Sequence, residues 1–217
     1  MINICFHGVG EPGRELEPGE HNYWISTEFF SAVLDAITGR PEVRLSFDDG
    51  NASDVEIGLA QLQQRDLTAT FFPIASRIGQ PGSTDQTGLR ALVGGGMRIG
   101  THGMWHQPWR GMTSLQLDEE LVSARQIIAE QSGVAVDTAA CPLGSYDRRV
   151  LARMRRLGYA TVFTSDRSRS APNAWLQPRF SLRASDDLPD VLNILNGQPS
   201  PKSRLIQAAR LTAKRWR

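Results

Sequence analysis

The sequence predicts an α/β fold: a distorted (β/α)7-type barrel in a single domain. Short strand-like segments alternate with helical segments along most of the 217 residues, and neither an internal repeat nor a linker rich in Pro, Gly and Ser interrupts the series. Strands that alternate with helices in this way are parallel and joined by helical crossovers. About seven such units fit the size of one barrel domain. A doubly wound open sheet is the competing architecture.

The expected strands are short apolar runs. Residues 43–47 alternate most clearly, because Val43, Leu45 and Phe47 lie on one face of an extended segment. Pro73 closes the run that begins at Thr68. The predicted strands cover residues 2–6, 43–47, 68–72, 97–100, 134–140 and 160–164.

Apolar residues at helical spacing predict the connecting helices. In residues 27–37, apolar side chains recur at helical spacing, at Phe29, Phe30, Val33, Leu34 and Ile37. The longest predicted helix ends at Gly133, a typical C-terminal stop. The predicted helices cover residues 27–37, 55–62, 89–93, 115–131, 149–157 and 187–195.

The composition indicates a globular protein without a dominant charge. Apolar residues make up 40% of the chain and charged residues 22%, and the formal net charge is +1. These values exclude a disordered or collagen-like chain, and they predict no nucleic-acid partner. Cys5 and Cys141 do not form a CxxC pair, so no disulfide framework is expected.

The first residues give an expectation for localisation. Residues 1–8 lack the basic start and the small-residue cleavage site of a signal peptide. The sequence also lacks a run of about 18–20 apolar residues that would cross a bilayer. We therefore expect a cytoplasmic protein.

The C-terminal tail, residues 201–217, differs from the barrel that is predicted over residues 1–200. Six basic residues and no acidic one lie between positions 202 and 217. One helical face would consist of Leu205, Ala209, Thr212 and Trp216. This pattern predicts a basic amphipathic helix. The helix either packs on the barrel or makes a peripheral membrane contact through residues 202–217.

Two adjacent carboxylates, Asp48 and Asp49, follow the strand predicted over residues 43–47. Like charges at such a position repel one another unless a cation or a proton relieves them. The pair therefore indicates a metal or acid–base site. An ordinary Asp-Gly turn that ends the strand is the alternative.

Two histidines, His102 and His106, lie one helical turn apart, as two ligands of one metal ion require. Taken alone, such a pair is also a common coincidence. His21 lies in a loop rich in Gly, Pro and Glu and is expected to be a loop residue.

The candidate residues share one feature, which is that each directly follows a predicted strand. Predicted strands immediately precede His7, the two aspartates, the two histidines and residues 141–144. In parallel α/β barrels the C-terminal ends of the strands converge on one face, where active sites are built. The candidate residues are therefore expected on one face of the barrel.

Three segments resemble the motifs of one family. Residues 44–50, RLSFDDG, resemble a (T/S)FDDG signature, and residues 101–106, THGMWH, resemble an H(S/T)xxH-type metal motif. Residues 140–146, ACPLGSY, are similar to an (A/R)xPYG loop. In this order the segments resemble the polysaccharide deacetylase superfamily (NodB-like, carbohydrate esterase family four), from about residue 4 to residue 180.

The resemblance implies a catalytic metal site. Asp49, His102 and His106 would be the three protein ligands, and two imidazoles with one carboxylate suit catalytic zinc. Zn²⁺ is the expected metal, with Co²⁺, Mn²⁺ and Ni²⁺ as alternatives. Asp48 would be the general base that takes a proton from the attacking water.

The position of the general acid along the sequence differs from the family's usual pattern. Most members carry it in a late LxH motif, but no histidine follows His106 here. The chain is more similar to a subgroup with permuted motifs, whose catalytic histidine lies near the N-terminus. Residues 5–9, CFHGV, match that segment and imply that His7 protonates the leaving amine. The alternative is a histidine that closes a strand and bonds to the backbone.

The resemblance implies two further roles, one from the subgroup and one from the superfamily's (A/R)xPYG loop. Residues 177–180, QPRF, resemble the subgroup's LPR-like segment, so Arg179 would orient Asp48; a surface arginine is the alternative. The loop of Pro142 and Leu143 would offer a backbone N–H to the oxyanion.

The resulting hypothesis is metal-dependent hydrolysis of an N-acetyl amide on an amino sugar of a glycan or glycan precursor. The partner would be an N-acetylated sugar or glycan. Trp105 and Asp166 would line the sugar site, although either side chain could be structural. The alternatives are a catalytically silent carbohydrate-binding homologue and a deacylase or deformylase of a non-polymeric amide.

Overall fold

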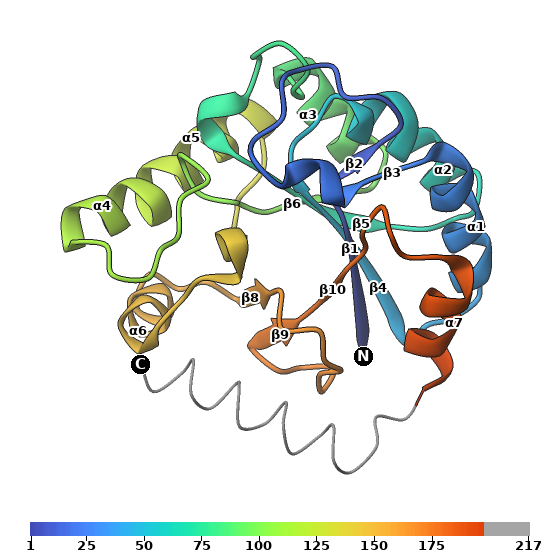
Figure 1. Ribbon diagram of the computed structural model, residues 1–217. Helices are drawn as coiled ribbons and strands as arrows, with labels where there is room; N and C mark the ends of the chain where they lie inside the picture. Colours follow the sequence, from blue (N-terminus) through green and yellow to red (C-terminus); the bar gives the residue numbers. More distant parts are fainter. Residues whose placement is uncertain (198–217) are drawn as a thin grey trace.

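Parallel strands form three sheets in the computed structural model, which describes residues 1–197 (Figure 1). Two of them build the barrel, and the third is the short pair of β2 (Gly8–Val9) and β3 (Trp24–Ile25). The larger sheet has the order β10-β1-β4-β5-β6 and the smaller one the order β7-β8-β9. The larger sheet consists of β1 (Ile2–Phe6), β4 (Val43–Asp49), β5 (Ala69–Pro73), β6 (Arg98–Ile99) and β10 (Phe180–Ser181). The smaller sheet consists of β7 (Thr138–Ala140), β8 (Thr161–Thr164) and β9 (Leu176–Pro178).

Two seams join the sheets into a closed barrel. At one seam, Thr101 forms a parallel bridge with Ala139, and the Ala140 N–H donates to the Thr101 carbonyl over 2.9 Å. At the other seam, only Arg179 separates β9 from β10, so one extended segment pairs with β8 at its start and with β1 at its end. The strand order therefore returns to β1. This confirms the predicted distorted (β/α)7-type barrel and excludes the open sheet.

Helices cover the outside of the barrel (Figure 1). The longer ones are α1 (Thr27–Ile37), α3 (Gln86–Gly94), α5 (Ala124–Ser132), α6 (Arg148–Arg156) and α7 (Leu188–Asn196). π-Helical turns adjoin two shorter helices: η2 (Asp54–Leu59) precedes α2 (Ala60–Gln63), and η4 (Glu119–Ser123) follows α4 (Ser114–Asp118). The remaining short elements are β2 (Gly8–Val9), β3 (Trp24–Ile25), η1 (Glu20–Tyr23), η3 (Ala75–Arg77) and η5 (Pro142–Gly144).

Most elements match the sequence expectations, with several corrections. The helix expected over residues 55–62 begins with the π-helical turn η2, and the short strands β2 and β3 were not predicted. The helix expected over residues 115–131 contains the π-helical turn η4, and the strand expected over residues 134–140 begins only at Thr138. The closing segment β9 and β10 was not predicted, because each piece is short and Pro178 interrupts the pattern of a strand. The predicted tail, residues 201–217, lies outside the described residues.

The aromatic core between the sheet and α1 fixes the strand faces. Phe47 and Phe71 stack at 4.5 Å, and Phe6 meets Phe30 of α1 edge to face at 4.9 Å. These rings face outward from the barrel. Because successive side chains of a strand point to opposite faces, the residues next to them on β4 and β5 face the barrel interior. Among the described residues, the structure contains no helix long and apolar enough to span a bilayer.

Candidate active site

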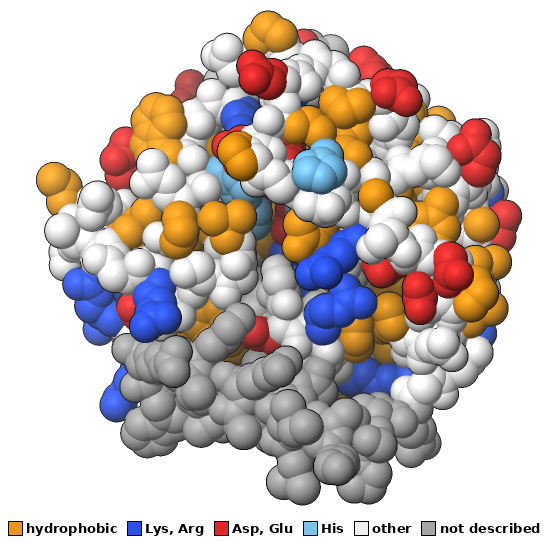
Figure 2. Space-filling model, viewed as in Figure 1, with side chains coloured by type: hydrophobic (Ala, Val, Ile, Leu, Met, Phe, Trp, Pro, Cys, Tyr) orange, Lys and Arg blue, Asp and Glu red, His pale blue; other side chains and the backbone are white. Residues whose placement is uncertain are grey.

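The predicted site residues lie at the C-terminal ends of the barrel strands. His7 follows β1, the aspartates Asp48 and Asp49 end β4, and His102 follows β6. Histidine side chains reach the surface beside a hollow in the face that Figure 2 shows. The structure thus brings together the strand-end groups that the sequence analysis selected.

Asp49 leaves the alternation of its strand. Its φ angle is +78°, in the left-handed region that few residues other than glycine adopt. Regular alternation would send two adjacent carboxylates to opposite faces. Instead, His102 Nε2 lies 3.8 Å from Asp48 Oδ2 and 3.6 Å from Asp49 Oδ1, so both carboxylates face one imidazole.

Gly50 makes this turn possible. Its φ angle is +72°, and an added Cβ would lie 2.9 Å from the Pro73 Cα atom on β5. A side chain at this position would therefore collide with the neighbouring backbone. The FDDG sequence thus combines the carboxylates with the backbone freedom that directs both of them inward.

Asp49, His102 and His106 form a cluster with the donor atoms of a metal site. Asp49 Oδ1 lies 3.6 Å from His102 Nε2 and 3.5 Å from His106 Nε2. The Asp49 side chain is buried, and neither of its oxygens accepts a hydrogen bond within residues 1–197. A buried carboxylate without partners is strongly disfavoured unless a cation or a proton compensates it. The three residues therefore fit a divalent metal.

Hydrogen bonds on the far side of each imidazole support this assignment. His102 Nδ1 lies 2.9 Å from the Ala140 carbonyl oxygen, and His106 Nδ1 lies 2.7 Å from Glu17 Oε2. Both acceptors favour a proton on Nδ1 and leave the Nε2 lone pair facing Asp49. Burial lowers the pKa of His102 to about 4, so its imidazole is neutral, as a metal ligand must be.

The spacing of the two histidines has a different structural basis from the one expected. Residues 101–106 form a loop, not a helical turn. Gly103 and His106 have φ angles of +84° and +56°, and this backbone turns the two rings toward each other at 5.3 Å. The expectation of a helical pair was therefore wrong, although the rings do meet.

Asp48 and Arg179 form a buried, two-bond ion pair. Arg179 Nη1 donates to Asp48 Oδ1 over 2.6 Å, and Nη2 donates to Oδ2 over 2.5 Å. Burial alone would raise the pKa of Asp48, but the charge and hydrogen bonds of Arg179, together with the neighbouring histidines, hold that pKa well below its usual range. Arg179 is fully buried, which excludes the surface-arginine alternative.

Further contacts fix the Arg179 guanidinium inside the barrel. Arg179 Nη1 also donates to Ser46 Oγ over 3.0 Å. The guanidinium carbon lies 5.4 Å from the Phe72 ring centre and 5.7 Å from that of Phe163. The arginine is therefore held by aromatic faces as well as by its carboxylate partner.

His7 lies beside Asp48 and against an aromatic ring. Its ring centre is 4.8 Å from that of Tyr23, and its ligand atoms fall in one close group with those of Cys5 and Asp48. His7 Nδ1 is buried and has no hydrogen-bond partner in the described part of the chain. The alternative of a histidine bonded through Nδ1 to the backbone is therefore not what the structure contains.

The loop after β7 and two other predicted residues complete the surroundings. Leu143 has a φ angle of +53° and is 65% exposed, while its neighbours Pro142 and Gly144 are buried. Trp105 is 53% exposed and donates from Nε1 to Glu119. Asp166 accepts hydrogen bonds from the hydroxyls of Tyr146 and Thr164. These two contacts hold the Asp166 carboxylate in place.

The sequence analysis missed two glutamates that hold the histidine loop. Glu17, which bonds to His106, also pairs with Arg77. Glu120 is buried in η4 and accepts from the backbone N–H groups of Met104 and Trp105. Glu120 lies next to Leu121, which belongs to the buried stripe of the predicted helix. A charged residue at such a position is rarely buried without a partner, and this would have marked Glu120 as a candidate. No local pattern marks Glu17.

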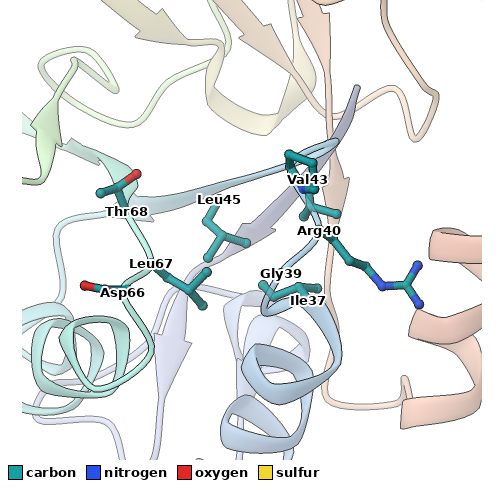
Figure 3. Close-up of a pocket in the computed structure, with 9 residues that line it drawn as sticks. Ile37, Gly39, Arg40, Val43, Leu45, Asp66, Leu67 and Thr68 are labelled. Atoms are coloured by element: carbon teal, nitrogen blue, oxygen red, sulfur yellow. The ribbon is translucent and has the colours of Figure 1, made fainter.

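A pocket at the opposite end of β4 is separate from this cluster (Figure 3). Its volume is about 350 Å³, and the end of α1 and residues 66–68 frame it. Its walls include Ile37, Val43, Leu45 and Leu67. The pocket lies at the N-terminal end of the strand that carries the aspartates at its C-terminal end. Cys5 and Cys141 are both buried.

The fold and the cluster define a class: an α/β barrel with a candidate three-ligand metal site at the C-terminal ends of its strands. Within that class, the chain belongs to the polysaccharide deacetylase family, whose model matches residues 35–162. The match includes both aspartates, both histidines of the loop and the segment after β7.

Individual relatives are distant. YxkH of Bacillus subtilis (strain 168) is 22% identical over 124 residues, which cover 57% of this chain and 44% of YxkH. Chitin deacetylase 1 of Cryptococcus neoformans var. grubii is 28% identical over 118 residues, which cover 54% of this chain and 24% of that protein. The chain therefore spans less than half the length of these curated relatives.

A solved structure is similar over most of both chains. The deacetylase PplD of Streptococcus pyogenes, in complex with acetate, superposes with a TM-score of 0.75 at 16% identity. The likeness covers 89% of this chain and 97% of that one. At this identity it shows that the two proteins share a fold.

Proposed function

We propose that this chain hydrolyses the N-acetyl amide of an amino sugar in a glycan or glycan precursor, with the help of a divalent metal. The observation that carries the proposal is the buried Asp49 carboxylate facing two imidazole Nε2 atoms, beside an ionised Asp48. Membership of the polysaccharide deacetylase family supports the reaction class. One relative is named for deacetylating chitin, and PplD holds acetate, the acid that such a reaction releases.

Asp49, His102 and His106 would hold the metal, with Zn²⁺ expected first and Co²⁺, Mn²⁺ or Ni²⁺ as alternatives. When bound, the metal makes a water more acidic and polarises a carbonyl group. The neutral state of His102 and the fixed Nδ1 contacts of both histidines suit this role.

Asp48 would take the proton of the attacking water. Each of its oxygens accepts one bond from Arg179, and a carboxylate oxygen has a second lone pair. Arg179 therefore fixes the plane of the carboxylate without using up its capacity to accept a proton. The low pKa keeps Asp48 in the basic, ionised form.

His7 would protonate the amine that leaves when the amide bond breaks. Its position beside Asp48 and against Tyr23 holds the ring on the same side of the site as the base. A backbone N–H near Leu143 would stabilise the negative oxygen of the tetrahedral intermediate. Trp105, exposed beside His106, would contact the sugar.

An amine-release assay tests the proposal. The zinc-loaded protein is incubated with N-acetylated chitooligosaccharides, monomeric N-acetylated amino sugars and an N-formylated amine. Free amine from the acetylated sugars supports the proposal. Release only from the formylated amine would replace it with the deformylase reading, and binding without release from any substrate would favour a silent sugar-binding homologue.

A further inference from the structure

Polar side chains line the barrel interior at the N-terminal ends of the strands. Six strands each contribute one apolar residue near this end to the hydrophobic core outside the barrel: Ile4, Leu45, Phe71, Ile99, Ala139 and Val162. Because successive side chains of a strand point to opposite faces, the residue before each of these faces the barrel interior. These inward-facing residues are Asn3, Arg44, Thr70, Arg98, Thr138 and Thr161.

The six inward-facing residues surround a cavity of about 330 Å³, which we call the basal cavity. The first residues of β4 to β8 also line it: Val43, Ala69, Arg98, Thr138 and Thr161. The basal cavity therefore lies at the opposite end of the barrel from the aspartates. Branched apolar side chains normally fill a barrel interior. The space equals that of about ten water molecules in the liquid, which is enough for a small ligand.

Ser46 and Phe163 line the inner end of the basal cavity. Ser46 Oγ accepts a hydrogen bond from Arg179 Nη1 over 3.0 Å, and the Phe163 ring centre lies 5.7 Å from the Arg179 guanidinium carbon. These contacts place the cavity behind the buried pair of Arg179 and Asp48. None of the three candidate metal ligands lines it.

The basal cavity is positively charged. Arg44 and Arg98 line it, and neither forms an ion pair within residues 1–197. Arg44 Nη1 donates to the Pro172 carbonyl over 3.2 Å, which leaves its other N–H groups for a ligand. No acidic residue of the described chain lines the cavity. Two such guanidinium groups suit a phosphate monoester, whose charge is about −1.5 to −2 at neutral pH.

The uncharged part of the lining suits hydroxyl groups. The hydroxyls of Thr70, Thr138 and Thr161 form no hydrogen bond in the part of the chain that the structure describes. Asn3 is 1% exposed, and its Nδ2 donates to three acceptors, among them Gln177 Oε1 over 2.9 Å. Its Oδ1 is buried and accepts no hydrogen bond from residues 1–197. Asn3 therefore has an acceptor for a ligand hydroxyl, and each threonine offers a donor and an acceptor.

We propose that the basal cavity binds a small phosphorylated sugar or polyol. Arg44 and Arg98 bind the phosphate, because guanidinium groups match phosphate oxygens with parallel N–H donors. Asn3 and the threonines bind the hydroxyl groups of the same ligand. The cavity is separate from the candidate metal site, so this proposal does not depend on the proposed function.

Isothermal titration calorimetry on the full-length protein tests the proposal. The ligands are glucose 6-phosphate, glycerol 3-phosphate, inorganic phosphate and glucose. The titrations are repeated with the double variant Arg44→Gln/Arg98→Gln and with Thr138→Val, which removes one hydroxyl. Arg90→Gln on α3 is the matched control, because Arg90 is exposed and donates to the Gln131 carbonyl much as Arg44 donates to a carbonyl.

We expect glucose 6-phosphate or glycerol 3-phosphate to bind at least about tenfold more tightly than glucose and inorganic phosphate. The double variant should lose this preference, Thr138→Val should weaken binding about twofold to tenfold, and Arg90→Gln should change nothing. The tighter of the two ligands identifies the carbon skeleton.

Two results would overturn the proposal. One is the absence of saturable binding by both phosphorylated ligands. The other is binding that the double variant retains, as expected if the phosphate binds at the metal site instead. Inorganic phosphate that binds as tightly as the two esters would overturn the assignment of a hydroxylated ligand.

Discussion

Asp48 and Arg179 are 131 residues apart in sequence, yet two hydrogen bonds join them in the centre of the barrel. Arg179 is also the residue between β9 and β10, at the seam that closes the barrel. Its backbone N–H donates to the Thr164 carbonyl of β8 over 2.8 Å. Closure of the barrel and orientation of the proposed base therefore depend on the same residue.

Replacing Arg179 should destabilise the fold. Arg179→Met leaves the buried Asp48 charge without a partner, which typically costs about 3–5 kcal/mol. Urea denaturation measures the free energy of unfolding. Arg153→Met is the matched control, because its partner Asp118 is about half exposed and such pairs contribute roughly 0–1 kcal/mol. If both variants lost a similar amount of unfolding free energy, the larger contribution assigned to the buried pair would be contradicted.

Glu17 should strengthen metal binding through His106. Glu17→Gln weakens the acceptor of the Nδ1 proton, and loss of such a contact typically lowers metal affinity about 10–100-fold. Competition with a zinc chelator measures the affinity. Glu15→Gln in the same loop should not change it, because Glu15 is exposed and its side chain forms no hydrogen bond or ion pair within residues 1–197. Unaltered affinity in Glu17→Gln would show that the carboxylate does not support the ligand.

His7→Ala should lower kcat by about 10²–10⁴-fold, as loss of a general acid does, and leave the metal content unchanged. Steady-state kinetics and metal analysis by mass spectrometry are measured on the same preparation. His21→Ala, in an exposed position, is the control histidine. Loss of the metal in His7→Ala would make His7 a ligand instead of the acid.

Gly103→Ala should distort the loop between the two histidines. An added Cβ would lie 2.2 Å from Glu120 Oε2, and the φ angle is +84°. Gly79→Ala is a matched control, since its φ angle is +77° but its Cβ would meet nothing within 4 Å. Left-handed backbone strain should destabilise both variants by roughly 1–2 kcal/mol, and only Gly103→Ala should also lose zinc affinity. Equal zinc affinity in the two variants would contradict the proposed role of the loop.

Local sequence was sufficient to predict much of the site. Asp48, Asp49 and the loop histidines were found because each follows an apolar strand, and parallel strands bring their C-terminal ends together. The helix over residues 27–37 was predicted to its observed bounds because its apolar residues recur at helical spacing.

Other features depend on contacts that no local pattern encodes. The segment β9 and β10 is held by strands from both ends of the chain and interrupted by Pro178. Glu17 meets a histidine 89 residues away. The two histidines were expected to lie one helical turn apart. Their spacing does not reveal the positive φ angles of Gly103 and His106, which bring the rings together in a loop instead.

The most direct test of the account combines metal content with amine release in the wild type, Asp49→Ala and Asp48→Asn. The account predicts one bound divalent metal and amine release in the wild type, loss of both in Asp49→Ala, and retained metal without release in Asp48→Asn. A wild-type protein that releases amine after complete removal of metal, or an Asp49→Ala variant that keeps its metal, would contradict the assignment of the site.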